Sequence, residues 1–390
     1  MNNNSATRFK RKGGGSFWLA AAVTFLVLST TAPGQNSQPT AQNASTATAP
    51  DSSSQTVLGS LANLPESDTL IYINLQRILN EAVPKVMPEK DLANMRSAFD
   101  EISQNAGIDP SKVDYIVIAV RFRKPSAELN FVPPEFMVVS SGHFSADSLM
   151  ILAKATAKDK LRDEKYGSKT LGVLTIEAIA KQSETNPLLK SFSEVAIVPL
   201  NANSIAVGTT GYLKAAVDAA DGRGRISTES LNSLLRDPSA LLSISGSPLT
   251  SFSKSFGLLG TETNARDSRC DSKFGDFYAA ITMDATNFML RGAMNADNPD
   301  TAKIIKSLLS NLLQQAAGSV PDRTAQSVLK TLSITPQDNE VVLRADIPQQ
   351  MIIEFIREQM KPKQEVSAPV KTPAPAAKRR HTHRRTKPAK

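Results

Sequence analysis

Apolar and polar residues along the middle of the chain follow a repeated pattern of paired strands and amphipathic helices. Short apolar runs, bounded by turn residues, predict strands at 69–74, 115–120, 136–140, 194–200, 204–208, 277–283, 288–294, 328–335 and 340–345. Apolar residues at spacings of three and four predict helices at 75–83, from Ser145 onward, at 213–220, at 299–318 and at 348–360.

Turn and cap residues connect these elements in a regular way. Asn201–Asn203, Asp284–Thr286 and Pro336–Asn339 separate pairs of strands and predict hairpins. Asn298 precedes Pro299 and an acidic residue, a typical helix start. Hairpins imply antiparallel pairing, so the pattern predicts an α+β fold with helices packed on one face of the sheet. It also suggests an internal duplication divided near 221–227, although any α+β chain can alternate in this way by chance.

The two ends of the chain differ from this middle. Residues 1–34 combine a basic start, a short apolar stretch (17–28) and small residues, the order of a secretory signal cleaved before Gln35. Because twelve apolar residues are few for a span, cleavage is expected, with an uncleaved inner-membrane anchor as the alternative. Low-complexity segments at 35–56 and 361–390 predict a disordered Ser/Thr/Ala/Gln linker and a disordered basic Pro/Ala/Lys/Arg tail. They flank two α+β domains, or two halves of one, at 57–224 and 225–360.

The net charge of +8 is unevenly distributed along the chain. The first 34 residues carry +4 and residues 361–390 carry +9, so the middle carries −5. A basic folded domain that binds nucleic acid specifically is therefore not expected. The charge is densest at 378–390, and the cations expected to bind polyanions there are Lys378, Arg379, Arg380, Arg384, Arg385 and Lys387. After an export signal, the expected partner is an anionic membrane surface or an envelope polymer. The alternative is a solvated tail without a dedicated partner.

Cys270 is the only cysteine, so no disulfide framework is expected. Its polar, mixed-charge surroundings favour an exposed free thiol, with an intermolecular disulfide as the sharper alternative. The sequence leaves the oligomeric state open.

The opening Leu64-Pro65-Glu66-Ser67-Asp68, followed by the strand 69–74, resembles the start of an exported bacterial envelope family of unknown function. In that family a Leu-Pro-x-x-Asp turn leads into a strand and then a helix. The resemblance implies an exported α+β fold and supplies no catalytic residues.

Few residue patterns in the chain indicate catalysis. His143 is the only histidine before the tail and favours a structural position at a strand end. Ser-x-x-Lys occurs at Ser251–Lys254 and at Ser327–Lys330, without the other elements of penicillin-recognising enzymes. Gly222–Arg225 lacks the Lys-Ser/Thr of a phosphate-binding loop and is expected to end a helix.

The sequence thus predicts no catalytic, cofactor-binding or metal-binding residues. The leading hypothesis is an exported, periplasmic or secreted, non-enzymatic binding or structural protein of the bacterial envelope. Its basic tail would contact polyanions, while its ligand stays open. The alternative is a hydrolase that acts on envelope material through Ser/Lys or carboxylate chemistry.

Overall fold

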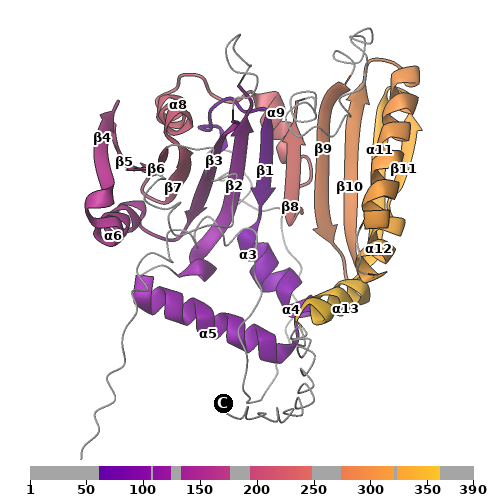
Figure 1. Cartoon of the computed structure of the whole chain (residues 1–390), viewed down its shortest axis with the longest axis horizontal. Coiled ribbons are helices and arrows are strands. Elements are labelled where there is room, and N and C mark those ends of the chain that lie inside the picture. The colour runs from indigo at the N-terminus through magenta and orange to yellow at the C-terminus, as the bar shows by residue number, and fades with distance from the viewer. Residues whose placement is uncertain are drawn as a thin grey trace, which may run out of the picture.

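A computed structural model describes residues 61–106, 109–123, 133–175, 194–247, 274–319 and 323–360. These residues form one antiparallel sheet of twelve strands (Figure 1). The first seven strands are β1 (Thr69–Ile73), β2 (Val113–Arg121), β3 (Glu135–Gly142), β4 (Leu161–Tyr166), β5 (Lys169–Thr175), β6 (Glu194–Asn201) and β7 (Ser204–Thr209). The remaining strands are β8 (Leu242–Gly246), β9 (Phe274–Met283), β10 (Asn287–Ala296), β11 (Ser333–Gln337) and β12 (Glu340–Pro348). The predicted α+β fold with hairpin-linked strands is confirmed.

The helices connect these strands. Those of the first half are α3 (Leu75–Arg77), α4 (Val83–Val86), α5 (Glu89–Ala106), α6 (Ala146–Ala157), α8 (Thr210–Ala220) and α9 (Thr228–Leu234). The second half contains α11 (Pro299–Ser319), α12 (Arg323–Lys330) and α13 (Gln349–Met360). A short π-helix at Ile78–Ala82 links α3 to α4, and single turns of 3₁₀-helix lie at Pro110–Lys112 and Lys158–Lys160.

The two halves of the sheet have the same strand arrangement. Across the sheet the order is β11-β12-β10-β9-β8-β1-β2-β3-β7-β6-β5-β4. In chain order, the first half consists of β1, the hairpin β2–β3, α6, the hairpin β6–β7 and α8. The second half repeats this order with β8, the hairpin β9–β10, α11, the hairpin β11–β12 and α13. The hairpin β4–β5 is an addition to the first half. Antiparallel pairing of β1 with β8 joins the halves into one sheet, in register from Thr69↔Gly246 to Ile73↔Leu242.

Local sequence signals explain several element boundaries. The side chain of Asn298 accepts a hydrogen bond from Thr301 N at 2.9 Å, as expected for the cap of α11. Ser227 caps α9 through Ser230 N at 3.1 Å. Asp284 accepts from Thr286 N and Asn287 N, both at 2.7 Å, and so forms the β9–β10 turn.

One sheet face, called here the α8 face, holds the main core. Because successive side chains of a strand point to opposite faces, Leu70 and Tyr72 point to this face while Ile71 and Ile73 point away. The core residues of neighbouring strands on this face, including Val117, Ala119, Met137, Val139, Ala196, Val198 and Ala206, are buried against α8 and α9. At about 25 cal/mol per Å² of apolar surface, this burial is the main source of stability.

Helices also cover the opposite face, called here the α6–α11 face. Gly172 of β5 lies against Met150 of α6, since a Cβ there would be 3.0 Å from the Met150 methyl carbon. At the other end of the sheet, α11 buries Ile305 against Met294 and Val341. The prediction that helices pack on one face is therefore wrong in this detail, because hairpin topology leaves open to which side each connecting helix crosses.

A second correction concerns residues 328–332, predicted as the start of a strand. Residues up to Lys330 belong to α12, and β11 begins only at Ser333. The apolar run Val328–Ile334 crosses a helix end and a strand start, and periodicity alone does not separate the two.

Candidate interaction surface

The middle of the α6–α11 face is apolar and partly exposed. Its residues come from adjacent strands in register, so that Ile244 faces Ile71, Ile71 faces Ile118, and Ile118 faces Val138. Neighbouring positions add further aliphatic residues, and all of them are intermediate in exposure: Ile73, Ile116, Ile118, Val120, Val138, Val207, Leu242, Ile244 and Ile281. We call this set the central apolar face. The α8 face of the same strands is buried, so the two faces of the central strands differ sharply.

Helices α6 and α11 lie at the two ends of the central apolar face and expose apolar side chains. Ile151 of α6 is 68% exposed and Ile304 of α11 is 54% exposed, and they are the exposed large hydrophobic residues of the described ranges. Each sits in the second turn of its helix, next to residues that pack on the sheet. A singly exposed apolar side chain is common on protein surfaces, and these two residues differ from that background in flanking the central apolar face.

Two partly exposed arginines pair with a buried carboxylate where β2 ends and β3 begins. Glu135 is 4% exposed, and one of its carboxylate oxygens accepts from Arg121 Nε at 2.9 Å and from Arg121 Nη2 at 2.5 Å. Its second oxygen pairs with Arg123 Nη2. A Cβ on Gly211, at the start of α8, would be 2.8 Å from that oxygen. Two guanidinium groups and the positive end of a helix dipole thus stabilise the carboxylate.

Tyr212 connects this cluster to the chain before β1. The Arg121 guanidinium lies 4.6 Å from the centre of the Tyr212 ring, a cation–π contact. The Tyr212 hydroxyl is 2.6 Å from Ser67 Oγ and donates to Glu66 O at 3.2 Å. Burial raises the pKa of Tyr212 to about 12. This network links β2, β3 and α8 to the segment that precedes β1.

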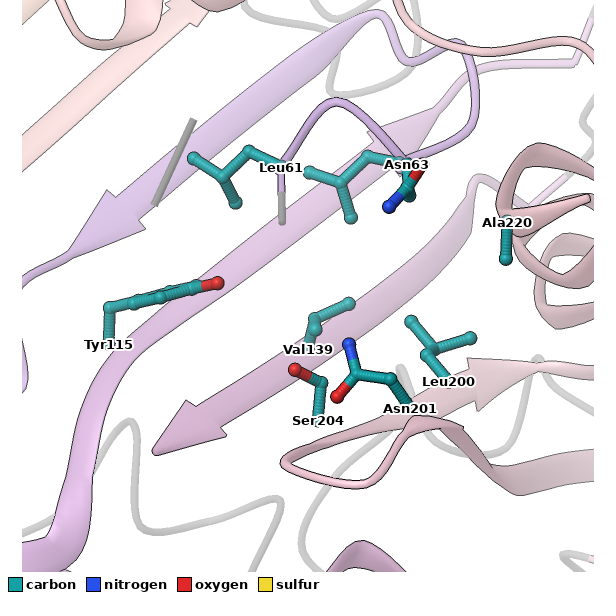
Figure 2. A pocket seen from close by; sticks show the side chains of 9 residues that line it. Leu61, Asn63, Tyr115, Val139, Leu200, Asn201, Ser204 and Ala220 are labelled. Carbon is teal, nitrogen blue, oxygen red and sulfur yellow. The ribbon is translucent and has the colours of Figure 1, made fainter. Parts of the chain in front are cut away.

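A small cavity of about 140 Å³ lies on the α8 face (Figure 2). Figure 2 shows the side chains of Tyr115, Val139, Asn201 and Ser204 around it, below the segment of Leu61. Ligand pockets usually measure roughly 300–1,000 Å³. The cavity is therefore large enough for a few water molecules and too small to define a substrate site.

Two predicted positions are seen directly. His143 follows β3, with a 76% exposed side chain whose Nε2 is 3.8 Å from Asp114 Oδ1. Its backbone N donates to Lys112 O at 2.7 Å, in agreement with a structural position at a strand end. Residues 222–225 follow α8, where Gly222 has a φ of +95° and Arg225 Nε donates to Ala219 O at 2.8 Å. The predicted helix stop is confirmed.

The predicted serine–lysine pairs are only partly visible. Ser327 and Lys330 lie one turn apart on α12. Ser251 and Lys254 lie outside the described residues, as do Cys270, the signal 1–34, the linker 35–56 and the tail 361–390 with its six predicted polyanion-binding residues. The hydrolase alternative and the tail's partners stay predictions.

Sequence reasoning missed the Arg121–Glu135 pair. The two residues lie one position outside the predicted strands 115–120 and 136–140, and they are direct partners in the register of β2 and β3. Pairing these two predicted strands as a hairpin and extending each by one residue would have placed Arg121 and Glu135 opposite each other, as a favourable cross-strand ion pair. Neither Ile151 nor Ile304 was distinguishable from core residues of its amphipathic helix.

Within the described ranges, no group of three or more His, Cys, Asp or Glu side chains could hold a metal ion. None of the helices described is long and apolar enough to span a bilayer.

No protein-family model and no curated protein matches the chain. Among solved structures, three crystal forms of TP0453 align with it. Form III is 10% identical with a TM-score of 0.40, covering 76% of this chain and 97% of that chain. Form I is 9% identical with a TM-score of 0.39, covering 77% and 97%, and form IV is 10% identical with a TM-score of 0.37, covering 76% and 95%. Likeness at this level carries no argument about function.

Proposed function

We propose that this chain is an exported, non-catalytic binding protein of the bacterial envelope whose basic tail binds anionic surfaces. The observation that carries the proposal is the cation density of the tail, with seven Lys or Arg among residues 378–390, behind a middle region of net charge −5. Each basic residue near an anionic surface contributes about 1 kcal/mol at moderate ionic strength. The attraction requires no defined tail structure and falls with added salt.

The position where the tail leaves the fold also suits this role. The tail continues from α13, which packs on α4, α12 and β12. Thirty residues span at most roughly 100 Å when fully extended. A surface contact by the tail therefore limits the distance between the folded part and that surface to this length.

Sedimentation with vesicles of phosphatidylglycerol and phosphatidylcholine tests the proposal, using the chain that starts at Gln35. One variant carries Gln in place of the six predicted polyanion-binding residues, Lys378, Arg379, Arg380, Arg384, Arg385 and Lys387. Six charges at about 1 kcal/mol each predict a more than 100-fold loss of binding. The matched control changes Arg379, Arg380, Arg384 and Arg385 to Lys, keeps the charge, and should bind within about twofold of the native chain.

Pure phosphatidylcholine vesicles and lipopolysaccharide micelles complete the experiment. Binding to phosphatidylglycerol vesicles or to micelles, but not to phosphatidylcholine, supports an anionic envelope surface as the partner. Unchanged sedimentation of the six-Gln variant with both anionic partners would overturn the role of the tail.

A further inference from the structure

The two exposed isoleucines lie on helices that correspond in the two halves of the fold. Helix α6 follows the hairpin β2–β3, and α11 follows the matching hairpin β9–β10. Both helices cross the same side of the sheet, α6 over β5 and β6 and α11 over β10, β11 and β12. Ile151 and Ile304 therefore lie on helices that cover the same face of the sheet, at its opposite ends.

We infer that this side of the molecule is a bilayer-docking surface, on which Ile151 and Ile304 insert among the lipids of an anionic membrane. The inference rests on the proposed function and adds to it the orientation of the folded part. Helices with a diameter of about 10 Å rise above the sheet on either side of the central apolar face. The exposed side chains of these helices are therefore the first apolar groups that a bilayer approaching this face would contact.

The charges around the two isoleucines are close to balanced, since Asp147 lies one turn before Ile151 and Asp300 one turn before Ile304. Lys303 and Lys306 adjoin Ile304 on α11, and Lys154 lies one turn after Ile151 on α6. Two of these lysines have acidic partners, since Lys303 pairs with Asp300 at 2.9 Å and Lys154 with Asp163 at 2.7 Å. The folded part thus contributes apolar contacts, and the tail of net charge +9 supplies the charge that brings it to the membrane. Stable surface binding commonly combines two such signals.

The sequence provides a clean optical test. Trp18 is the only tryptophan, so the chain that starts at Gln35 has none. Single reporters are introduced as Ile151→Trp and Ile304→Trp. The control reporter is Asn232→Trp, at an exposed position of α9, the helix that packs on the opposite α8 face. Emission is recorded with phosphatidylglycerol–phosphatidylcholine vesicles whose acyl chains carry bromine as a quencher.

The reporters at 151 and 304 should shift to the blue and be quenched by the brominated chains, while the reporter at 232 should stay unquenched. The chain that starts at Gln35 with both Ile151→Ser and Ile304→Ser should bind vesicles with at least about tenfold lower affinity in sedimentation, because both apolar contacts are lost. Equal quenching at all three positions, or none at 151 and 304 with vesicles bound, would overturn the docking face.

Failure of this inference differs from failure of the proposed function. If the six-Gln tail variant loses binding but the two Ser substitutions change nothing, the tail role stands and the docking face is wrong. If the Ser substitutions weaken binding and the tail variant does not, the face stands and the tail role is wrong. Concentration-dependent dimerisation that the two Ser substitutions abolish, without quenching by bromine, would identify the surface as an interface between two copies.

Discussion

Replacing Glu135 with Gln should destabilise the fold by about 2 kcal/mol. Its carboxylate makes two hydrogen bonds to Arg121 and an ion pair to Arg123. A hydrogen bond to a charged group contributes about 1.5–3 kcal/mol, and the amide retains one acceptor. Because the Arg121 and Arg123 side chains are 35% and 54% exposed, solvent screening reduces the larger cost expected for a fully buried pair.

Urea unfolding measures this effect through the free energy of unfolding obtained by linear extrapolation. The matched control is Glu81→Gln, which breaks the exposed pair between Arg77 and Glu81 at 2.6 Å, one helical turn apart. That control should cost about 0.5 kcal/mol or less. A double-mutant cycle of Arg121→Gln and Glu135→Gln should give a coupling energy of about 1 kcal/mol or more.

Equal costs for the two Glu→Gln variants would refute the reasoning, since they would show that burial adds nothing to the pair. A coupling energy near zero would also refute it, because the cost of Glu135→Gln would then arise outside the contact with Arg121. Both outcomes are readable from one set of five unfolding curves, those of the native chain, Glu135→Gln, Glu81→Gln, Arg121→Gln and the double variant.

Two further predictions concern the close packing of β3 with β7 and the buried tyrosines. A Cβ on Gly208 would lie 2.2 Å from Phe136 O, so Gly208→Ala should destabilise by about 2 kcal/mol or more, whereas Gly318→Ala, with nothing within 4 Å, should be neutral or slightly stabilising in thermal unfolding. Burial raises the pKa of Tyr72 and of Tyr212 to about 12, so both phenols should ionise late in an alkaline absorbance titration. Because burial favours the neutral phenols, their contribution to stability is fully present below about pH 10, where the phenols of the unfolded chain are also neutral. This contribution should be lost as the pH rises toward 12, because the unfolded chain then ionises more readily than the folded one. Tyr212→Phe should remove one late-ionising phenol, and ionisation of all phenols near pH 10 in folded protein would contradict the assignment.

Local patterns predicted most of the elements, because turn and cap chemistry acts within a few residues. The hairpin around Asn201–Asn203, the cap of α11 at Asn298 and the stop of α8 at Gly222 were all predicted and are all present. Weaker patterns were missed: the charged strand β4 alternates little in hydrophobicity, and β8 is a short run of mixed Leu, Ser and Ile. Tertiary pairing makes both of them strands.

The sequence by itself determined the element types, the antiparallel hairpins and the separation of a basic tail from an acidic middle, since all of these follow from spacing and composition. Only the tertiary structure decided that two similar halves share one twelve-stranded sheet, and that α6 and α11 cross the same face. The physical reason is that an amphipathic helix shows which of its residues are apolar, but its packing partner decides how many of them are buried. Met150 and Ile305 are therefore core residues, while their neighbours Ile151 and Ile304 remain in solvent.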